Sequence, residues 1–134
     1  MWTDEAALGA ARRRVDDWEA TIAERATRTT ALTRELAALT ATARSPDGAV
    51  EATVDAAGAL VDLRLDERVR KQPAARTADQ VLATTRAAQA ELVRRAVAAT
   101  EAALGADDPA ARAVVESYAR RLRRPDEGGA GAAR

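Results

Sequence analysis

Apolar positions recur at alternating spacings of three and four residues through the first third of the sequence. The positions on this repeat are Leu8, Ala11, Val15, Trp18, Ile22, Arg25, Thr29, Leu32, Leu36 and Leu39. Such a heptad spacing is typical of a helix with one apolar face, and neither Gly nor Pro interrupts residues 10–44. The pattern therefore predicts a long helix from about residue 3 to residue 42, roughly 60 Å in length.

Two polar residues, Arg25 and Thr29, interrupt the apolar face of this helix near its middle. A dry helix–helix interface would bury both side chains at a cost, so we expect looser packing or solvent at that point. A small domain cannot cover so long a helix along its whole length. Two interpretations stay open: the helix lies on its own domain, or a partner subunit shares it, and the second is favoured.

The apolar period changes to two residues after the turn signal Ser45-Pro46-Asp47-Gly48. Apolar residues alternate with polar ones over residues 50–54 and again over residues 61–65, which predicts an antiparallel β-hairpin with one apolar face. An isolated two-stranded hairpin is marginal in water, so we expect it to gain strands or a helix cover from a second subunit. The residues predicted to form this homodimer interface are Val50, Val54, Val61, Leu63 and Leu65.

Residues 66–76 form a polar connector in which Val69 could start a short third strand. Thr77-Ala78-Asp79-Gln80 has the form of a capping box, which predicts a second long helix from there to about Leu104. The apolar stripe of this helix includes Val81, Leu82, Ala88, Leu92, Ala96 and Ala99.

Gly105 is expected to end the second helix, and Asp108 followed by Pro109 is typical of the start of another. The predicted organisation is a helix–hairpin–helix domain at residues 1–106, an additional short helix within residues 107–124 and a disordered tail at residues 125–134.

The composition removes most catalytic chemistry. The chain has no His and no Cys, so it lacks the commonest general base, thiol nucleophiles and thiolate metal ligands. Only two serines are present, Ser45 and Ser117, and neither can be paired with a His base. We therefore predict a protein that is not an enzyme and holds no metal or cofactor.

The N-terminal sequence has acidic residues before its Arg run and no uninterrupted apolar stretch, so we expect neither a signal peptide nor a membrane span. The absence of Cys fits a reducing compartment. The expected location is the cytoplasm.

Positive and negative charges balance, with 21 Lys and Arg against 21 Asp and Glu. A neutral chain has no global field that attracts phosphate, so any DNA contact must come from local clusters. The candidate DNA-binding residues are Arg12, Arg13, Arg14, Arg94 and Arg95, and a further Arg cluster lies at residues 120–124. Each cluster could instead be a solvated or ion-paired face, and Arg14 could pair with Glu19 of a partner helix.

The order of these elements resembles the YbaB/EbfC family of nucleoid-associated DNA-binding proteins. The resemblance rests on GAVEATVD at residues 48–55, GALVDLRLD at residues 58–66 and the Ala-rich QVLATTRAAQAELVRRA that follows, and it spans roughly residues 8–103. Ala52 stands where the family's first strand usually has a bulkier residue. The resemblance implies an α+β subunit that dimerises through its strands, so that two long helices project like tweezers, and sequence-tolerant binding of double-stranded DNA in the nucleoid.

Two functions remain in competition at this point. The first is a non-catalytic homodimer that binds DNA with little sequence specificity through Arg side chains on its helices. The second is a protein–protein interaction module on the same fold, for instance a secretion-system component, which the neutral charge and the open apolar seam favour.

Overall fold

The computed structural model of this chain describes residues 2–122, with side chains from residue 4 onward. Helix α1 (Trp2–Ala37) leads into strands β1 (Ala41–Arg44), β2 (Val50–Val54) and β3 (Leu60–Leu65). A short 3-10 helix, η1 (Glu67–Lys71), connects the strands to α2 (Ala74–Leu104), and α3 (Pro109–Arg121) follows. The fold class is α+β, as the sequence predicts, and the predicted tail at residues 125–134 lies outside the described residues.

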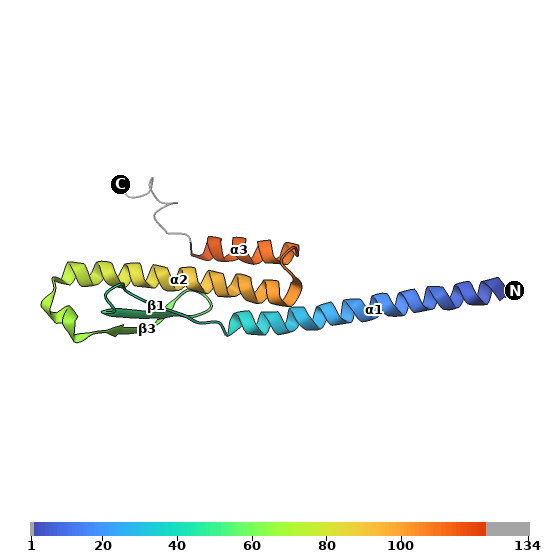
Figure 1. Ribbon diagram of the computed structural model, residues 1–134, viewed down its shortest axis with the longest axis horizontal. Helices are drawn as coiled ribbons and strands as arrows, with labels where there is room; N and C mark the ends of the chain where they lie inside the picture. The colour runs from blue at the N-terminus through green and yellow to red at the C-terminus, as the bar shows by residue number, and fades with distance from the viewer. Residues whose placement is uncertain (1, 123–134) are drawn as a thin grey trace, which may run out of the picture.

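Helix α2 is the central element of the molecule, because one side of it covers β1 and β2 while α3 and the end of α1 pack elsewhere on it (Figure 1). Its buried side chains recur every fourth residue: Thr84, Ala88, Leu92, Ala96 and Thr100. Leu92 shares one buried cluster with Ala41, Val54 and Tyr118, which brings helices and sheet together. The stripe predicted for this helix is therefore correct in part, since Leu82 is exposed and two Thr are buried instead.

Helix α1 extends far beyond the other elements (Figure 1). Every residue from 11 to 31 is exposed, and Leu32 is the first buried side chain along the helix. At Arg25 the helix meets α3, where a guanidinium nitrogen lies 2.8 Å from a carboxylate oxygen of Asp108. We term residues 4–24 the arm and residues 25–122 the body.

The first helix is shorter than the sequence predicts, because it ends at Ala37 and residues 41–44 form β1. Strand β1 pairs antiparallel with β2, and Ala41 is buried against the core. Across the same pair, the hydroxyl oxygens of Thr42 and Thr53 lie 2.8 Å apart. These long-range contacts outweigh the weak helix preference of a Thr-containing segment, so neither Gly nor Pro is needed to end the helix.

The third strand of the sheet is β1 and not a strand at Val69. The order is β1-β2-β3, and Val69 lies in η1, whose start is capped by the Asp66 carboxylate accepting a hydrogen bond from the backbone N–H of Arg68. The register of β2 and β3 places Leu65 opposite Val50 and Leu63 opposite Ala52.

The predicted capping box does not open α2, because the N-cap is Pro73, four residues before Thr77, and the helix begins at Ala74. The Gln72 side-chain amide donates instead to the oxygens of Thr77 and Gln80, which ties the helix to the end of η1. The predicted boundaries at Gly105 and Asp108 are confirmed: Gly105 ends α2 with a φ of 93°, and Asp108 caps α3.

Candidate nucleic-acid interface

The run Arg12, Arg13 and Arg14 lies on the arm, and all three side chains are exposed. A helix turns by about 100° per residue, so three consecutive guanidinium groups spread over most of its circumference. Within residues 2–122, none of the three lies within 4.0 Å of a carboxylate oxygen, although Asp16 and Asp17 follow four residues later. These guanidinium groups are therefore open to anionic partners of the protein.

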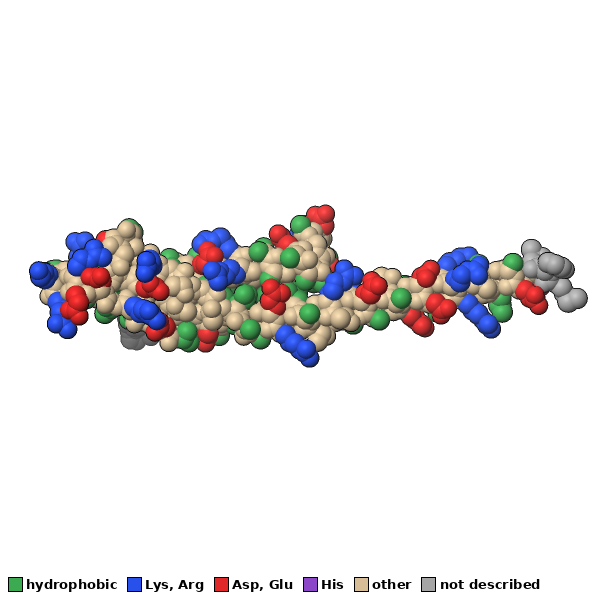
Figure 2. Space-filling view, turned by 60° about the horizontal axis from the view of Figure 1, so that its bottom comes forward, with side chains coloured by type: hydrophobic (Ala, Val, Ile, Leu, Met, Phe, Trp, Pro, Cys, Tyr) green, Lys and Arg blue, Asp and Glu red, His purple; other side chains and the backbone are tan. Residues whose placement is uncertain are grey.

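Acidic side chains accompany the arginines along the arm, since Asp4, Glu5, Asp16 and Asp17 are exposed on the same helix. Figure 2 shows cationic and acidic side chains interspersed along the arm and over the body on the face it draws. The fields of such interspersed opposite charges largely cancel at a distance, and salt at 0.1 M screens what remains beyond about 10 Å. Attraction to phosphate can then act only at contact distance.

The second candidate pair, Arg94 and Arg95, lies on α2 and is engaged within the body. Arg94 donates two hydrogen bonds to Glu91 at 2.6 and 3.0 Å, and Arg95 donates to the other carboxylate oxygen of Glu91 at 3.3 Å. Both lower the pKa of Glu91, with the hydrogen bond from Arg94 as the largest cause. Arg95 also donates to the carbonyl oxygen of Thr40 at 3.1 Å, which holds the link between α1 and β1 against α2.

The two Arg clusters do not come together in one chain, because one lies on the arm and the other on the body. The pair on α2 shares a single carboxylate, which leaves it one net positive charge, whereas the arm carries three cations without such pairing. The arm arginines are accordingly the stronger candidates for contacts with phosphate.

The residues predicted for a dimer interface separate into two groups. Val50 and Val54 are 0% exposed within the single chain, so the prediction is corrected for both: they belong to the core of the subunit and offer no surface to a partner. In contrast, Val61, Leu63 and Leu65 on β3 are exposed to 58%, 38% and 47%. Their strand pairs with β2 on one edge but lies beyond the part of the sheet that α2 covers.

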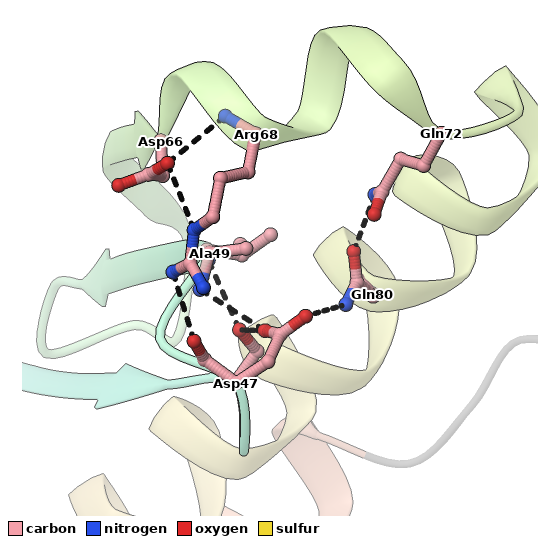
Figure 3. A network of polar contacts seen from close by, with 8 residues as sticks. Asp47, Ala49, Asp66, Arg68, Gln72 and Gln80 are labelled. Atoms are coloured by element: carbon pink, nitrogen blue, oxygen red, sulfur yellow. Dashed lines mark hydrogen bonds and ion pairs between the residues drawn. The ribbon is translucent and has the colours of Figure 1, made fainter.

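A polar network at the far end of the body was missed by the sequence analysis (Figure 3). Asp47 accepts hydrogen bonds from the Ser45 hydroxyl, the backbone N–H of Ala49 and the Gln80 amide, and Arg68 donates to its carbonyl oxygen at 2.9 Å. These bonds, the one from Ala49 first, lower the pKa of Asp47 to about 2. The network joins the β1–β2 turn to η1 and α2, so its role is structural; the turn signal at residues 45–48 was the sequence feature that pointed to it.

A model of the YbaB/EbfC DNA-binding family matches residues 10–107. The chain belongs to this family.

The part shared with the YbaB/EbfC family contains most of the arm, the three strands, η1 and α2, and it includes all five candidate arginines. Helix α3 begins two residues after the match ends. No curated protein and no solved structure matches the chain. Across residues 2–122, no helix has the length and apolar character needed to cross a bilayer, and no group of three or more acidic residues is placed to hold a metal ion.

Proposed function

We propose that this YbaB/EbfC protein is a non-catalytic, homodimeric nucleoid-associated protein of the cytoplasm that binds double-stranded DNA with little sequence specificity. The observation that carries the proposal is the run Arg12-Arg13-Arg14 on the arm of a DNA-binding family member, exposed and without carboxylate partners among the described residues. No cofactor is required, because contacts between guanidinium groups and phosphate need only charge and hydrogen bonding.

Phosphate contacts from an exposed helix explain why sequence specificity is expected to be low. Guanidinium groups that reach the DNA backbone fix the position of the protein but read no base edges. The neutral net charge supplies no long-range attraction, so binding depends on the few arginines that touch phosphate.

A homodimer through β3 supports this function by placing two arms on one particle. The outer edge of β3 has no neighbouring strand within residues 2–122. Its exposed Leu60, Leu63 and Leu65 lie opposite Val54, Ala52 and Val50 and so continue the apolar side of the sheet past α2. Strand pairing across this edge with a second copy would satisfy the free backbone groups and cover the apolar side chains. The tweezer-like arrangement that the family resemblance implies would then bring two sets of arm arginines to one duplex.

The test is salt-dependent binding to duplexes of unrelated sequence. Three arginines from each of two subunits offer about six phosphate contacts, so the slope of log K against log salt should reach at most about −5. Replacing Arg12, Arg13 and Arg14 by Ala should remove most of this slope and leave the circular dichroism spectrum unchanged, because Ala is a good helix former.

A matched control removes the same charge from the body. The triple change of Arg76, Arg86 and Arg112 to Ala affects exposed residues of α2 and α3 that have no ion pair among the described residues. We expect this control to bind DNA with the affinity of the wild type and the arm variant to lose affinity. Equal affinities in the wild type and the arm variant would refute the assignment of the arm arginines.

A protein-binding module is the second candidate, favoured by the zero net charge and by the exposed apolar side chains of the arm, among them Trp18 and Ile22. The same titration separates the two functions. If the wild-type protein fails to retard duplex DNA even at low salt, the protein-binding function replaces the nucleoid one.

A further inference from the structure

The arm carries an uncovered apolar stripe that the proposed DNA contacts do not use. Leu8, Val15, Trp18 and Ile22 are exposed to 59%, 51%, 66% and 48%. Their spacings of seven, three and four residues place them on one face of α1, together with Ala11. A continuous exposed apolar face of this kind, with a Trp among its members, is typical of a helix that packs against another helix.

Toward the C-terminal end of α1 the same stripe packs against the body, and this sets the length of the part that remains exposed. Leu32 is buried, and Leu36 packs against the core cluster. The carboxylate of Asp108 pairs with Arg25, which is the first contact between α1 and the start of α3. The uncovered large apolar side chains of the stripe therefore extend from Leu8 to Ile22.

We infer that the arm pairs with the arm of a second copy of this chain, with the two helices antiparallel. In the register that places Val15 opposite Trp18 of the second copy, Ala11 lies opposite its Ile22, so each small side chain faces a large one. The pairing is symmetric, and each of these contacts occurs twice. In this register Leu8 of each helix lies level with Arg25 of the other, so the paired stretch from Leu8 to Ile22 coincides with the uncovered stripe.

Charge complementarity supports this register. Arg12 and Glu19 occupy equivalent positions beside the stripe, one at each end of its central part, and both are exposed. In an antiparallel pair formed without DNA, Arg12 of each helix lies beside Glu19 of the other, which gives two ion pairs. Shifting the helices by one heptad in either direction places Arg12 beside Arg12 or Glu19 beside Glu19, and these like charges disfavour both alternatives.

A parallel pair fits the molecule less well. It would place Ala11 opposite Ala11 and Trp18 opposite Trp18. The two bodies would then lie side by side at the same end of the pair, because each body contacts its own helix at Arg25 and buries it from Leu32 onward. The antiparallel pair keeps the bodies at opposite ends. Since this contact is separate from β3, copies joined through both surfaces form chains of dimers with Arg13 directed away from the seam.

Disulfide trapping tests the orientation directly, since the natural chain contains no Cys. Purified Ala11→Cys and Ile22→Cys proteins, mixed and oxidised without DNA, should form the mixed 11–22 disulfide in preference to either symmetric one. In the same register Arg13 of one helix is level with Ala20 of the other, but both lie on the side of α1 that faces away from the partner. A control mixture of Arg13→Cys and Ala20→Cys should therefore form little mixed disulfide. Predominance of an 11–11 disulfide, or no disulfide above the control, would overturn the proposal.

Charge reversal tests the register in solution. Arg12→Glu and Glu19→Arg should each weaken association of the arms about five-fold, as expected for two exposed ion pairs, and the double variant should restore it. Sedimentation equilibrium measures the association, and Arg13→Glu serves as the control with unchanged assembly. If the double variant associates as weakly as either single variant, the pairing is refuted. It is also refuted if the wild-type protein has no larger mass than Ile22→Glu, a variant that places a charge in the stripe. DNA is absent from both assays, so failure of the proposed DNA binding would leave their outcomes unaffected.

Discussion

Two single replacements of an apolar residue by Asp, at Val54 on β2 and at Leu63 on the neighbouring β3, should have different consequences: the first should unfold the subunit and the second should only separate the dimer. Val54 on β2 is 0% exposed and belongs to the central cluster with Leu92. Val54→Asp would bury a carboxylate without a partner, at a cost of about 3–5 kcal/mol beyond the lost apolar burial. Because small domains are stable by only about 5–15 kcal/mol, this variant should be largely unfolded.

Leu63 on β3 is 38% exposed in the single chain, so Leu63→Asp removes only part of the burial of one Leu, about 1–2 kcal/mol. The variant should keep native circular dichroism and a cooperative melt while its mass in sedimentation falls from dimer to monomer. Arg64→Asp introduces the same residue on the same strand but on its opposite face, and should remain dimeric. If Leu63→Asp unfolds as completely as Val54→Asp, or keeps the mass of the wild type, the assignment of β3 as the dimer surface is refuted.

Two further predictions concern stability. The pKa of Asp47 is about 2 against an ordinary 3.8, so its stabilising effect should be complete above about pH 4 and disappear as the pH falls toward 2. Asp47→Asn should therefore lower the denaturant midpoint at pH 7, and the difference in midpoint between variant and wild type should be smaller at pH 2.5. Equal differences in midpoint at both pH values would contradict this. Gly105→Ala should lower the free energy of unfolding by about 1–2 kcal/mol, because φ is 93° and side chains disfavour that conformation. The added methyl group meets open space and so adds no steric cost. Gly58→Ala should cost more, because φ is 84° and the methyl group would also collide with the side chain of Leu122; equal melting temperatures for the two variants would count against that contact.

The sequence predicted the elements whose evidence is local. The change of apolar period from three or four residues to two located β2 and β3, and the signals at Gly105 and Asp108 located the boundary between α2 and α3. It failed at residues 41–44, where no Gly or Pro ends the helix and the strand exists through pairing with β2. It also misplaced the start of α2, because the residues of the apparent capping box are used by Gln72.

For the candidate site, the sequence indicated which arginines cluster but not which of them are already engaged. Arg94 and Arg95 meet Glu91 on the same helix at spacings of three and four residues, a pairing that helix geometry allows but does not require. The contact between Arg95 and Thr40 joins residues 55 apart, and no local pattern signals it. Which cations remain open to phosphate was therefore decided by folding.

By itself, the sequence determined the type and order of the elements and the apolar face of each, because these depend on spacings within a few residues along the chain. Only the tertiary structure decided how those faces are used. Alternation along β2 and β3 predicts the same apolar side for both strands, yet α2 covers β2 and leaves β3 exposed. The heptad repeat continues through α1 in the same way, while the body buries it only from Leu32 onward. Burial depends on what lies opposite a face in space, and that is a property of distant segments and of other copies of the chain.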